Sequence, residues 1–179
     1  MSLHSPTVVL ISGQPGSGKT TLARPLATEL DLPLLSKDTI KEALASLTDK
    51  SSMTAAESKT LGSAAFDVVF ALLREGASAV VEASWNPTIA ASELLSLSQR
   101  LVEVHCRCDP ETARRRYMER SSHRHWVHAN QERFNDDWLW APETSNPLGI
   151  GATTISIDTT HPVDITAITE RIITSANKS

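Results

Sequence analysis

Cysteine and long apolar runs are scarce in this chain, and each absence excludes a class of protein. Two cysteines occur among 179 residues, Cys106 and Cys108. They stand too close together on an expected strand to crosslink a fold, and a single C-x-C pair lacks the further ligands of a zinc site. No apolar run is long enough to cross a bilayer, and Met1 to Thr7 lack the basic segment typical of a secretory signal. We therefore expect one cytoplasmic domain over residues 1–179, not bound to a membrane.

Positive charge is also limited. The chain has 17 Lys and Arg against 21 Asp and Glu, a formal net charge of −4. A surface that holds duplex nucleic acid needs a basic face, so this balance disfavours nucleic acid as a partner. Hydrophobic residues at 40% and charged residues at 21% are close to globular averages, which excludes collagen, coiled-coil and wholly disordered chains. A globular domain large enough to bury a core remains.

Apolar runs typical of β-strands alternate with helical patterns along the whole chain, which indicates a parallel sheet covered by helices on both faces. The third run is almost continuously apolar, as strands buried on both faces are. The predicted fold class is therefore α/β, with a doubly wound sheet of five strands. The strands are expected at Thr7 to Ser12, Pro33 to Ser36, Ser78 to Ala83, Leu101 to Cys108 and Thr153 to Ile157.

Several helices begin with recognisable cap residues. Thr54 and Glu57 fit a capping box, and Asp109 precedes a proline at a first helical position. The helix after Thr54 should end at Gly76. Its residues on one apolar face are Leu61, Ala65, Val68 and Leu72.

A phosphate-binding loop is the strongest motif in the chain. The segment from Gly13 to Thr20 reads GQPGSGKT and matches G-x-x-x-x-G-K-[ST] between an expected strand and an expected helix. This context favours a nucleotide site over a glycine-rich turn with a chance lysine, because backbone N–H groups and the helix dipole then face the phosphates. Lys19 is predicted to reach the β- and γ-phosphates, and the Thr20 hydroxyl to ligate Mg²⁺. The candidate nucleotide-binding residues are Gly13, Gln14, Pro15, Gly16, Ser17, Gly18, Lys19, Thr20 and Thr21.

With this loop the chain resembles the P-loop kinases of the nucleoside-monophosphate-kinase-like group. The resemblance is strongest to the small members that phosphorylate hydroxyls: chloramphenicol phosphotransferase, gluconate and shikimate kinases, zeta toxins and phage polynucleotide kinase domains. It is carried by the loop, by Ser36-Lys37-Asp38, by Val80-Val81-Glu82-Ala83-Ser84 and by the arginine-rich segment from Arg114.

The resemblance implies a three-layer P-loop NTPase fold with sheet order 2-3-1-4-5. It also implies ATP as the phosphate donor and an arginine-rich lid over approximately residues 114–140. GTP-binding switch proteins fit poorly, because the chain has no N-K-x-D guanine motif. Nothing in the motifs suggests a mechanical AAA+ ring, and the chain is short for one.

Asp38 follows the second expected strand, and ligands of open α/β sheets bind outside the carboxyl ends of the strands. In the resembled kinases an aspartate here holds the acceptor hydroxyl and can take its proton, which implies a catalytic and substrate-binding role for Asp38. The alternative is that Asp38 caps the helix expected over Thr39 to Leu47. We expect the neighbouring Lys37 to be solvated.

Glu82 ends the buried third strand, in the place of a Walker-B acid. A buried carboxylate is costly unless it meets a cation or hydrogen-bond donors. Glu82 is therefore a candidate to bind the metal, directly or through water, or to recognise the acceptor. Ser84 and Asn86 lie just beyond it and are candidates to bind a polar acceptor, although a helix-capping role explains Asn86 equally well.

Arg116, Arg120 and Arg124 recur every four residues, so on a continuing helix they share one face. Lid arginines of the resembled kinases neutralise charge on the transferring phosphoryl group, which implies catalytic roles for Arg116 and Arg120 and substrate binding by Arg124. The alternative is a solvated basic helix paired with Glu111 and Glu119.

The same segment is rich in histidine and tryptophan. No carboxylate or cysteine completes a metal site there, so lid or acceptor contacts are favoured over metal binding. The tryptophans form either a lid hinge and acceptor wall or an apolar core beneath the segment. The resemblance further implies that the loop Asp158 to Pro162 borders the adenine. The residues concerned are His123, His125, His128, Trp126, Trp138 and Trp140.

The sequence thus predicts an ATP- and Mg²⁺-dependent kinase that transfers the γ-phosphate to a hydroxyl of a small polar molecule. One rival is a polynucleotide 5′-hydroxyl kinase, which the arginine segment permits and the acidic balance disfavours. The other is a nucleotide-binding regulatory protein without acceptor chemistry, which Asp38 disfavours. The sequence defines neither the acceptor nor the oligomeric state. Specificity should lie between Leu47 and Met53, around Trp85 and in the lid.

Overall fold

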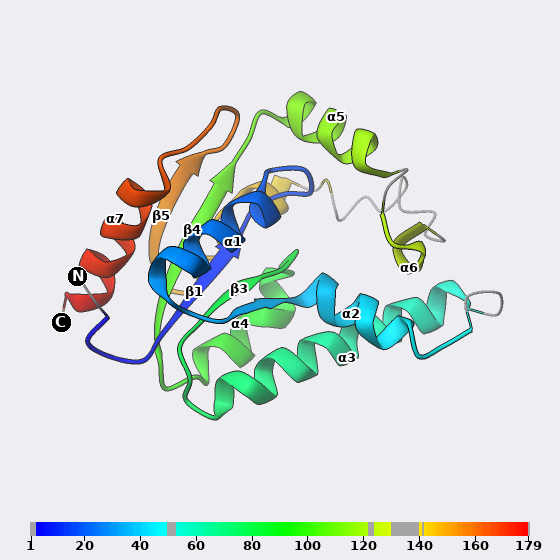
Figure 1. Cartoon of the computed structure of the whole chain (residues 1–179), viewed down its shortest axis with the longest axis horizontal. Helices are drawn as coiled ribbons and strands as arrows, with labels where there is room; N and C mark the ends of the chain where they lie inside the picture. Colours follow the sequence, from blue (N-terminus) through cyan, green and yellow to red (C-terminus); the bar gives the residue numbers. More distant parts are fainter. Residues whose placement is uncertain (1–2, 50–52, 122–123, 130–139, 141, 179) are drawn as a thin grey trace.

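The computed structural model describes residues 3–49, 53–121, 124–129, 140 and 142–178, and at its centre is a parallel sheet between two layers of helices (Figure 1). The sheet has the strand order β2-β3-β1-β4-β5, and each neighbouring pair is parallel. The predicted fold class and strand order are confirmed, and each strand boundary lies within one residue of its expected place. The strands are β1 (Thr7–Ser12), β2 (Leu34–Ser36), β3 (Ala79–Glu82), β4 (Arg100–Arg107) and β5 (Thr153–Asp158).

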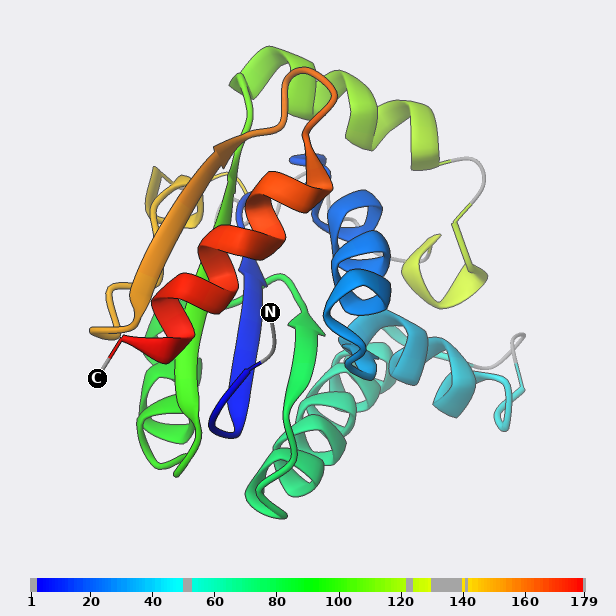
Figure 2. The same cartoon turned by 60° about the vertical axis from the view of Figure 1, so that its left-hand side comes forward.

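Helices bury both faces of this sheet (Figure 2). On one face Val9 and Ile11 of β1 pack against α1 (Lys19–Leu30) and α7 (Ile165–Asn177). On the other face Val8 and Leu10 pack against α3 (Ala55–Arg74) and α4 (Pro87–Leu95). Because successive side chains of a strand point to opposite faces, a strand covered on both sides is apolar at consecutive positions, as β1 is from Val8 to Ile11.

Helix α3 begins and ends as predicted, but it presents a different face to the core. The capping box of Thr54 and Glu57 is present, and Gly76 follows the helix with φ of 85°. Val68 and Leu72 of the predicted apolar face are 40% and 48% exposed. Neighbouring stripes of a helix lie roughly 100° apart, and the sheet selects the stripe next to the predicted one. That stripe consists of Ala65, Val69, Phe70 and Leu73.

Shorter elements surround the carboxyl end of the sheet. Helix α2 (Lys37–Ala45) packs against α3, and α5 (Pro110–Ser121) follows β4. The Asp109 carboxylate accepts a hydrogen bond from the Thr112 N–H at 2.8 Å, which confirms it as the cap of α5. Helix α6 (Trp126–Ala129) contacts α2, and a 3-10 helix (Pro142–Ser145) precedes β5.

The two cysteines differ in their surroundings. Cys106 is buried in the core on β4, and burial raises the pKa of its thiol to about 12. Cys108 is half-buried just beyond the strand, and both thiols are free. A packing role therefore fits Cys106 better than Cys108.

A kinase-type nucleotide and acceptor site

The phosphate loop joins β1 to α1 and is packed tightly from outside. Gly13, Gly16 and Gly18 all have positive φ, at 130°, 77° and 86°. A Cβ atom at Gly13 would lie 2.4 Å from the Cys106 carbonyl oxygen, and one at Gly16 would lie 2.0 Å from the Ala113 carbonyl oxygen. The glycines at positions 13 and 16 are therefore required both by backbone conformation and by the close approach of β4 and α5.

Lys19 lies inside the arch of this loop. Its ammonium donates hydrogen bonds to the carbonyl oxygens of Gly13 at 2.8 Å and Gln14 at 2.9 Å. Burial lowers the pKa of Lys19, and the charges of Glu82 and Asp38 partly offset that effect. A desolvated cation held inside a ring of backbone amides is a strong binding group for phosphate.

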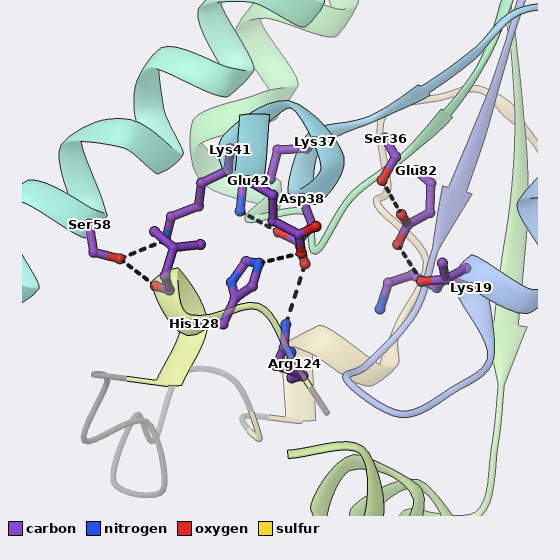
Figure 3. Close-up of polar contacts among 12 residues, drawn as sticks. Lys19, Ser36, Lys37, Asp38, Lys41, Glu42, Ser58, Glu82, Arg124 and His128 are labelled. Atoms are coloured by element: carbon purple, nitrogen blue, oxygen red, sulfur yellow. Dashed lines mark hydrogen bonds and ion pairs between the residues drawn. The ribbon is translucent and has the colours of Figure 1, made fainter. Parts of the chain in front are cut away.

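Glu82 reaches the same loop from the end of β3. Its Oε1 accepts a hydrogen bond from the Thr20 hydroxyl at 3.3 Å, and its Oε2 accepts one from the Ser36 hydroxyl at 2.9 Å (Figure 3). The carboxylate is buried, so these donors stabilise it where water cannot. A hydroxyl and a carboxylate side by side are the oxygen donors that suit Mg²⁺ beside phosphate.

Asp38 lies in the first turn of α2, held between two cations. Its carboxylate accepts hydrogen bonds from Lys37 Nζ at 2.8 Å and Arg124 Nη2 at 3.4 Å (Figure 3). Burial alone would raise the pKa of Asp38, but Lys37, His128 and Arg124 outweigh it and hold that pKa well below its ordinary value. Helix α2 begins at Lys37 and its N-cap residue is Ser36, two residues before Asp38, so the alternative in which Asp38 caps this helix is wrong.

The expectation of a solvated Lys37 is wrong. Its side chain is 13% exposed, and its ammonium lies over the Phe66 ring, 5.8 Å from the centroid. The ring and the Asp38 carboxylate together fix the position of this ammonium. This contact could not be predicted from a local pattern, because Phe66 lies on α3, far along the chain.

The three spaced arginines do not share one helix face. Helix α5 ends at Ser121, so Arg124 stands beyond it and reaches Asp38 on α2. Arg116 donates to the carbonyl oxygens of Thr159 at 2.9 Å and Thr160 at 2.8 Å, in the loop after β5. Burial lowers the pKa of Arg120, with the neighbouring Arg124 acting in the same direction. The catalytic roles of Arg116 and Arg120 stay predictions.

One cavity of about 1380 Å³ brings most of the predicted site together. Its wall also includes residues of α2 and α3 that the sequence did not single out, among them Lys41, Ser58 and Phe66. Gln14 instead lines a second cavity of about 350 Å³ beside Cys108. The predicted residues in the wall of the large cavity are Pro15, Gly16, Gly18, Lys19, Thr20, Asp38, Glu82, Ser84, Asn86, Arg120 and Arg124.

The remaining predicted residues of the loop and lid have other surroundings. Gly13, Ser17, Thr21 and Arg116 are absent from the described walls of both cavities. Residues 124–129, which belong to the predicted lid, contact α3: the Ser58 hydroxyl donates to the Val127 carbonyl oxygen at 2.9 Å. Closure of this segment over a nucleotide stays a prediction.

The described histidines and tryptophans of the predicted lid make separate contacts. His128 is buried, and its Nε2 lies 3.0 Å from Glu42 Oε1, while Trp140 packs edge-on against Tyr117 of α5. His123 and Trp138 lie outside the described residues. Within the described ranges, no group of three or more His, Cys, Asp or Glu side chains is placed to hold a metal ion.

A phosphate loop on β1, a buried acid on β3 and the sheet order β2-β3-β1-β4-β5 define a P-loop phosphotransferase. The family model described as "AAA domain" (AAA_33) matches residues 8–137, and the chain belongs to that family. Among the helices of the described ranges, none is long and apolar enough to cross a membrane.

Solved structures share this fold. A presumed kinase from Chloroflexus aurantiacus J-10-fl is 25% identical with a TM-score of 0.80, over 96% of this chain and 99% of that chain. A gluconokinase from Sinorhizobium meliloti 1021 is 15% identical with a TM-score of 0.55, over 96% of this chain and 91% of its own. A shikimate kinase from Acinetobacter baumannii, in complex with shikimate, is 18% identical with a TM-score of 0.55, over 95% and 92%.

Curated relatives match over a short segment. A cytidylate kinase from Pyrobaculum neutrophilum is 60% identical over 38 residues, and the match spans 21% of each chain. One from Pyrobaculum arsenaticum is 61% identical over 33 residues, or 18% of each chain. The family and the fold confirm the predicted class, a P-loop kinase of the nucleoside-monophosphate-kinase-like group.

Proposed function

We propose that this protein transfers the γ-phosphate of ATP, with Mg²⁺, to a hydroxyl of a small polar acceptor. The observation that carries the proposal is that Lys19, Glu82 and Asp38 line one cavity of about 1380 Å³. Its volume exceeds the range of roughly 300–1,000 Å³ usual for a site with one ligand, and so suits a nucleotide and an acceptor together.

The donor half of the site is formed by the phosphate loop. Its backbone N–H groups and Lys19 bind the phosphates, and Thr20 and Glu82 supply the oxygens that would hold Mg²⁺. When bound, Mg²⁺ neutralises charge that develops on the phosphate oxygens. Arg120 lines the same cavity, where its charge also acts on Lys19, and can add positive charge for the phosphates.

The acceptor half centres on Asp38, which Lys37 and Arg124 keep ionised. An ionised carboxylate accepts a hydrogen bond from the acceptor hydroxyl and aims its oxygen at the γ-phosphorus. The new O–P bond forms as the bond from the γ-phosphorus to its bridging oxygen breaks, and ADP leaves. A carboxylate with a lowered pKa is a weak base, so Asp38 contributes orientation first and takes the hydroxyl proton late in the transfer.

The cavity wall, the shared fold and the net charge of the protein also support a small molecule as the acceptor. Ser84, Asn86 and Ser58 give the wall of the same cavity neutral hydrogen-bonding groups. The fold is shared with a gluconokinase and a shikimate kinase, both enzymes of small hydroxylated acids. A net charge of −4 disfavours an oligonucleotide acceptor.

The decisive experiment is Asp38→Asn, after an acceptor has been found by screening metabolites and nucleosides for ADP release above the acceptor-free rate. We expect the affinity for ATP to stay nearly unchanged, because the loop and Lys19 hold the phosphates. The kcat for transfer should fall by roughly a hundredfold to ten-thousandfold.

Asp164→Asn is the matched control, because Asp164 caps α7 through the Ala167 N–H at 3.1 Å. Asparagine is nearly as good a cap as aspartate, so this variant should keep its activity. If Asp38→Asn also keeps near-wild-type kcat, Asp38 serves only its helix and the acceptor role is wrong.

A further inference from the structure

A buried polar cluster lies beneath the phosphate loop and takes no part in the chemistry described above. Ser12 ends β1, and Glu103 and His105 lie beside it on β4, where His105 is the register partner of Ser12. Each of the three is 1% exposed, and none lines either described cavity. Hydrolases use serine, histidine and a carboxylate as a catalytic set, but no substrate can reach a set buried this deeply.

The cluster forms a continuous chain of hydrogen bonds. Ser12 Oγ lies 2.5 Å from Glu103 Oε1 and 3.0 Å from His105 Nδ1, and His105 Nε2 lies 3.0 Å from the Ser145 carbonyl oxygen. Glu103 also accepts hydrogen bonds from the Leu148 N–H at 2.9 Å and the Thr154 hydroxyl at 3.1 Å. These hydrogen bonds therefore connect β1 with residues 145–148, at the end of the 3-10 helix and just beyond it.

The number of donor hydrogens that these hydrogen bonds require determines how many protons Glu103 and His105 hold together. The Ser145 carbonyl oxygen only accepts, so His105 Nε2 must carry a hydrogen. If Glu103 is ionised, the single hydrogen of Ser12 goes to Glu103, and Nδ1 must then carry a hydrogen as well. If instead Nδ1 is bare, Ser12 donates to it, and Glu103 must be protonated to donate to Ser12. Both arrangements hold one proton more than a neutral imidazole with an ionised carboxylate.

We propose that Glu103 and His105 share one buried proton and that, through it, they act as positioning residues for the phosphate loop. Ser12 directly precedes Gly13, so its place determines where the loop begins. The same residues 145–148 reach the loop a second time, because the Ser145 hydroxyl donates to Gln14 Oε1 at 3.0 Å. Gln14 Nε2 in turn donates to the Cys108 carbonyl oxygen at 2.9 Å.

The charges around His105 determine when the proton is lost. Burial lowers the pKa of His105, and Arg107 and Lys19 act in the same direction, while the Ser145 carbonyl and Glu103 raise it. The proton is bound at low pH and leaves as pH rises through the pKa of His105, which is lowered from its ordinary value. Without it, one of the three hydrogen bonds Ser12–Glu103, Ser12–His105 and His105–Ser145 must break, which loosens the start of the loop.

The proton count is tested by NMR on the protein without nucleotide. At pH about 5.5, roughly one unit below the ordinary pKa of histidine because the pKa of His105 is lowered, ¹⁵N shifts of the His105 ring and the ¹³C shift of the Glu103 carboxyl are recorded. Signals are assigned by their disappearance in His105→Gln and Glu103→Gln. We expect either an imidazolium with a carboxylate or a neutral ring with a carboxylic acid. A neutral ring beside an ionised carboxylate would overturn the proposal.

The positioning role rests on the proposed nucleotide site, and it is tested by the Kd of Mg²⁺-ADP. Loss of one or two neutral hydrogen bonds in His105→Gln should raise this Kd by roughly three- to tenfold. Thr169→Ala removes a buried hydroxyl on α7 and is the control, with an expected Kd equal to wild type. Equal Kd values in His105→Gln and wild type would contradict the positioning role.

A second readout, the charge state of the His105 ring, separates positioning from a general loss of stability. In Glu103→Gln the shared proton has no carboxylate to hold it, so the His105 ring should be neutral at the same pH. Binding of ADP requires no acceptor, so a failure of the transfer chemistry leaves this result intact. If wild-type protein does not bind Mg²⁺-ADP, the proposed function fails, while the NMR experiment still decides the proton count.

Discussion

At the scale of single residues, Lys19 is the clearest test of the donor half. Lys19→Ala removes the one side-chain cation inside the loop, so kcat/KM for ATP should fall by roughly a hundredfold to a thousandfold, as for other transition-state charge donors. The fold should stay cooperative, since burial of the ammonium is itself unfavourable. Steady-state turnover and thermal melting check both parts, with the surface variant Lys178→Ala as control. Unchanged turnover in Lys19→Ala would remove the phosphate-loop interpretation.

The low pKa of Asp38 predicts how activity depends on pH. Because Lys37 and Arg124 hold this pKa below its ordinary value, Asp38 stays ionised as pH falls, and its ion pairs weaken only below the pKa of a free carboxyl. In Lys37→Met the pKa should rise, and the acidic limb of the kcat profile should move toward neutral pH. Profiles of kcat for wild type and Lys37→Met, at saturating ATP, measure this. Superimposable acidic limbs would show that Lys37 does not control Asp38.

Site residues could be predicted from the sequence where the pattern that marks them lies within a short segment of the chain. The phosphate loop, Asp38 and Glu82 each lie at the carboxyl end of a strand or within two residues of it, so the sequence alone indicated the cavity that they line. The cluster around His105 was not predicted, because a polar residue inside an apolar strand does not reveal its partner on the next strand. The link from Arg116 to the loop after β5 was missed for the same reason.

At the scale of elements, the contact between the phosphate loop and α5 can be tested by two glycine substitutions. Gly16→Ala would place a Cβ 2.0 Å from the Ala113 carbonyl oxygen, so the loop or α5 must move and nucleotide binding should be lost. Gly149→Ala is the matched control, with φ of 66° and nothing within 4 Å of the added atom. It should cost only the backbone strain of about 1–2 kcal/mol.

Chemical unfolding and the Kd for Mg²⁺-ADP, measured on both glycine variants, give the comparison. Gly16→Ala should lose more stability than Gly149→Ala, and it alone should lose nucleotide affinity. Similar effects in both variants would mean that the packing against α5 does not shape the loop.

Strands and caps were predicted to within one residue, whereas helix length and orientation were not. Arg116, Arg120 and Arg124 fit one helix face only while the helix continues, and the sequence near Ser121 has no glycine or proline to mark its end. The face of α3 was misjudged because Val68 and Val69 are equally apolar. Which of them is buried depends on the sheet, not on the helix itself.

At the scale of the whole molecule, net charge predicts the kind of acceptor. With a charge of −4, the protein should phosphorylate 5′-hydroxyl oligonucleotides poorly compared with its best small-molecule acceptor. Transfer of labelled phosphate from ATP to each acceptor, at low and at physiological salt, makes the comparison. Efficient transfer to an oligonucleotide that weakens steeply with salt would favour the polynucleotide kinase alternative.

The acceptor itself could not be predicted, for a physical reason that concerns the assembled chain. The cavity wall combines residues of α2, α3, α4 and α5, which are separated by long stretches of sequence. Their side chains have no common spacing, and only the folded arrangement of these helices gives the cavity its shape. Specificity of this kind resides in a few contacts that many sequences can supply.

The unequal surroundings of the two thiols allow the protein to report its own ligand. Maleimide reagents react with thiolates, and the thiol of Cys106, with its pKa raised to about 12 and its side chain in the core, will not react in the folded protein. Cys108 is half-buried beside Gln14 and 3.5 Å from Arg116. A fluorophore attached to native protein therefore occupies one defined position next to the phosphate loop, and its emission can follow nucleotide arrival without any engineered cysteine.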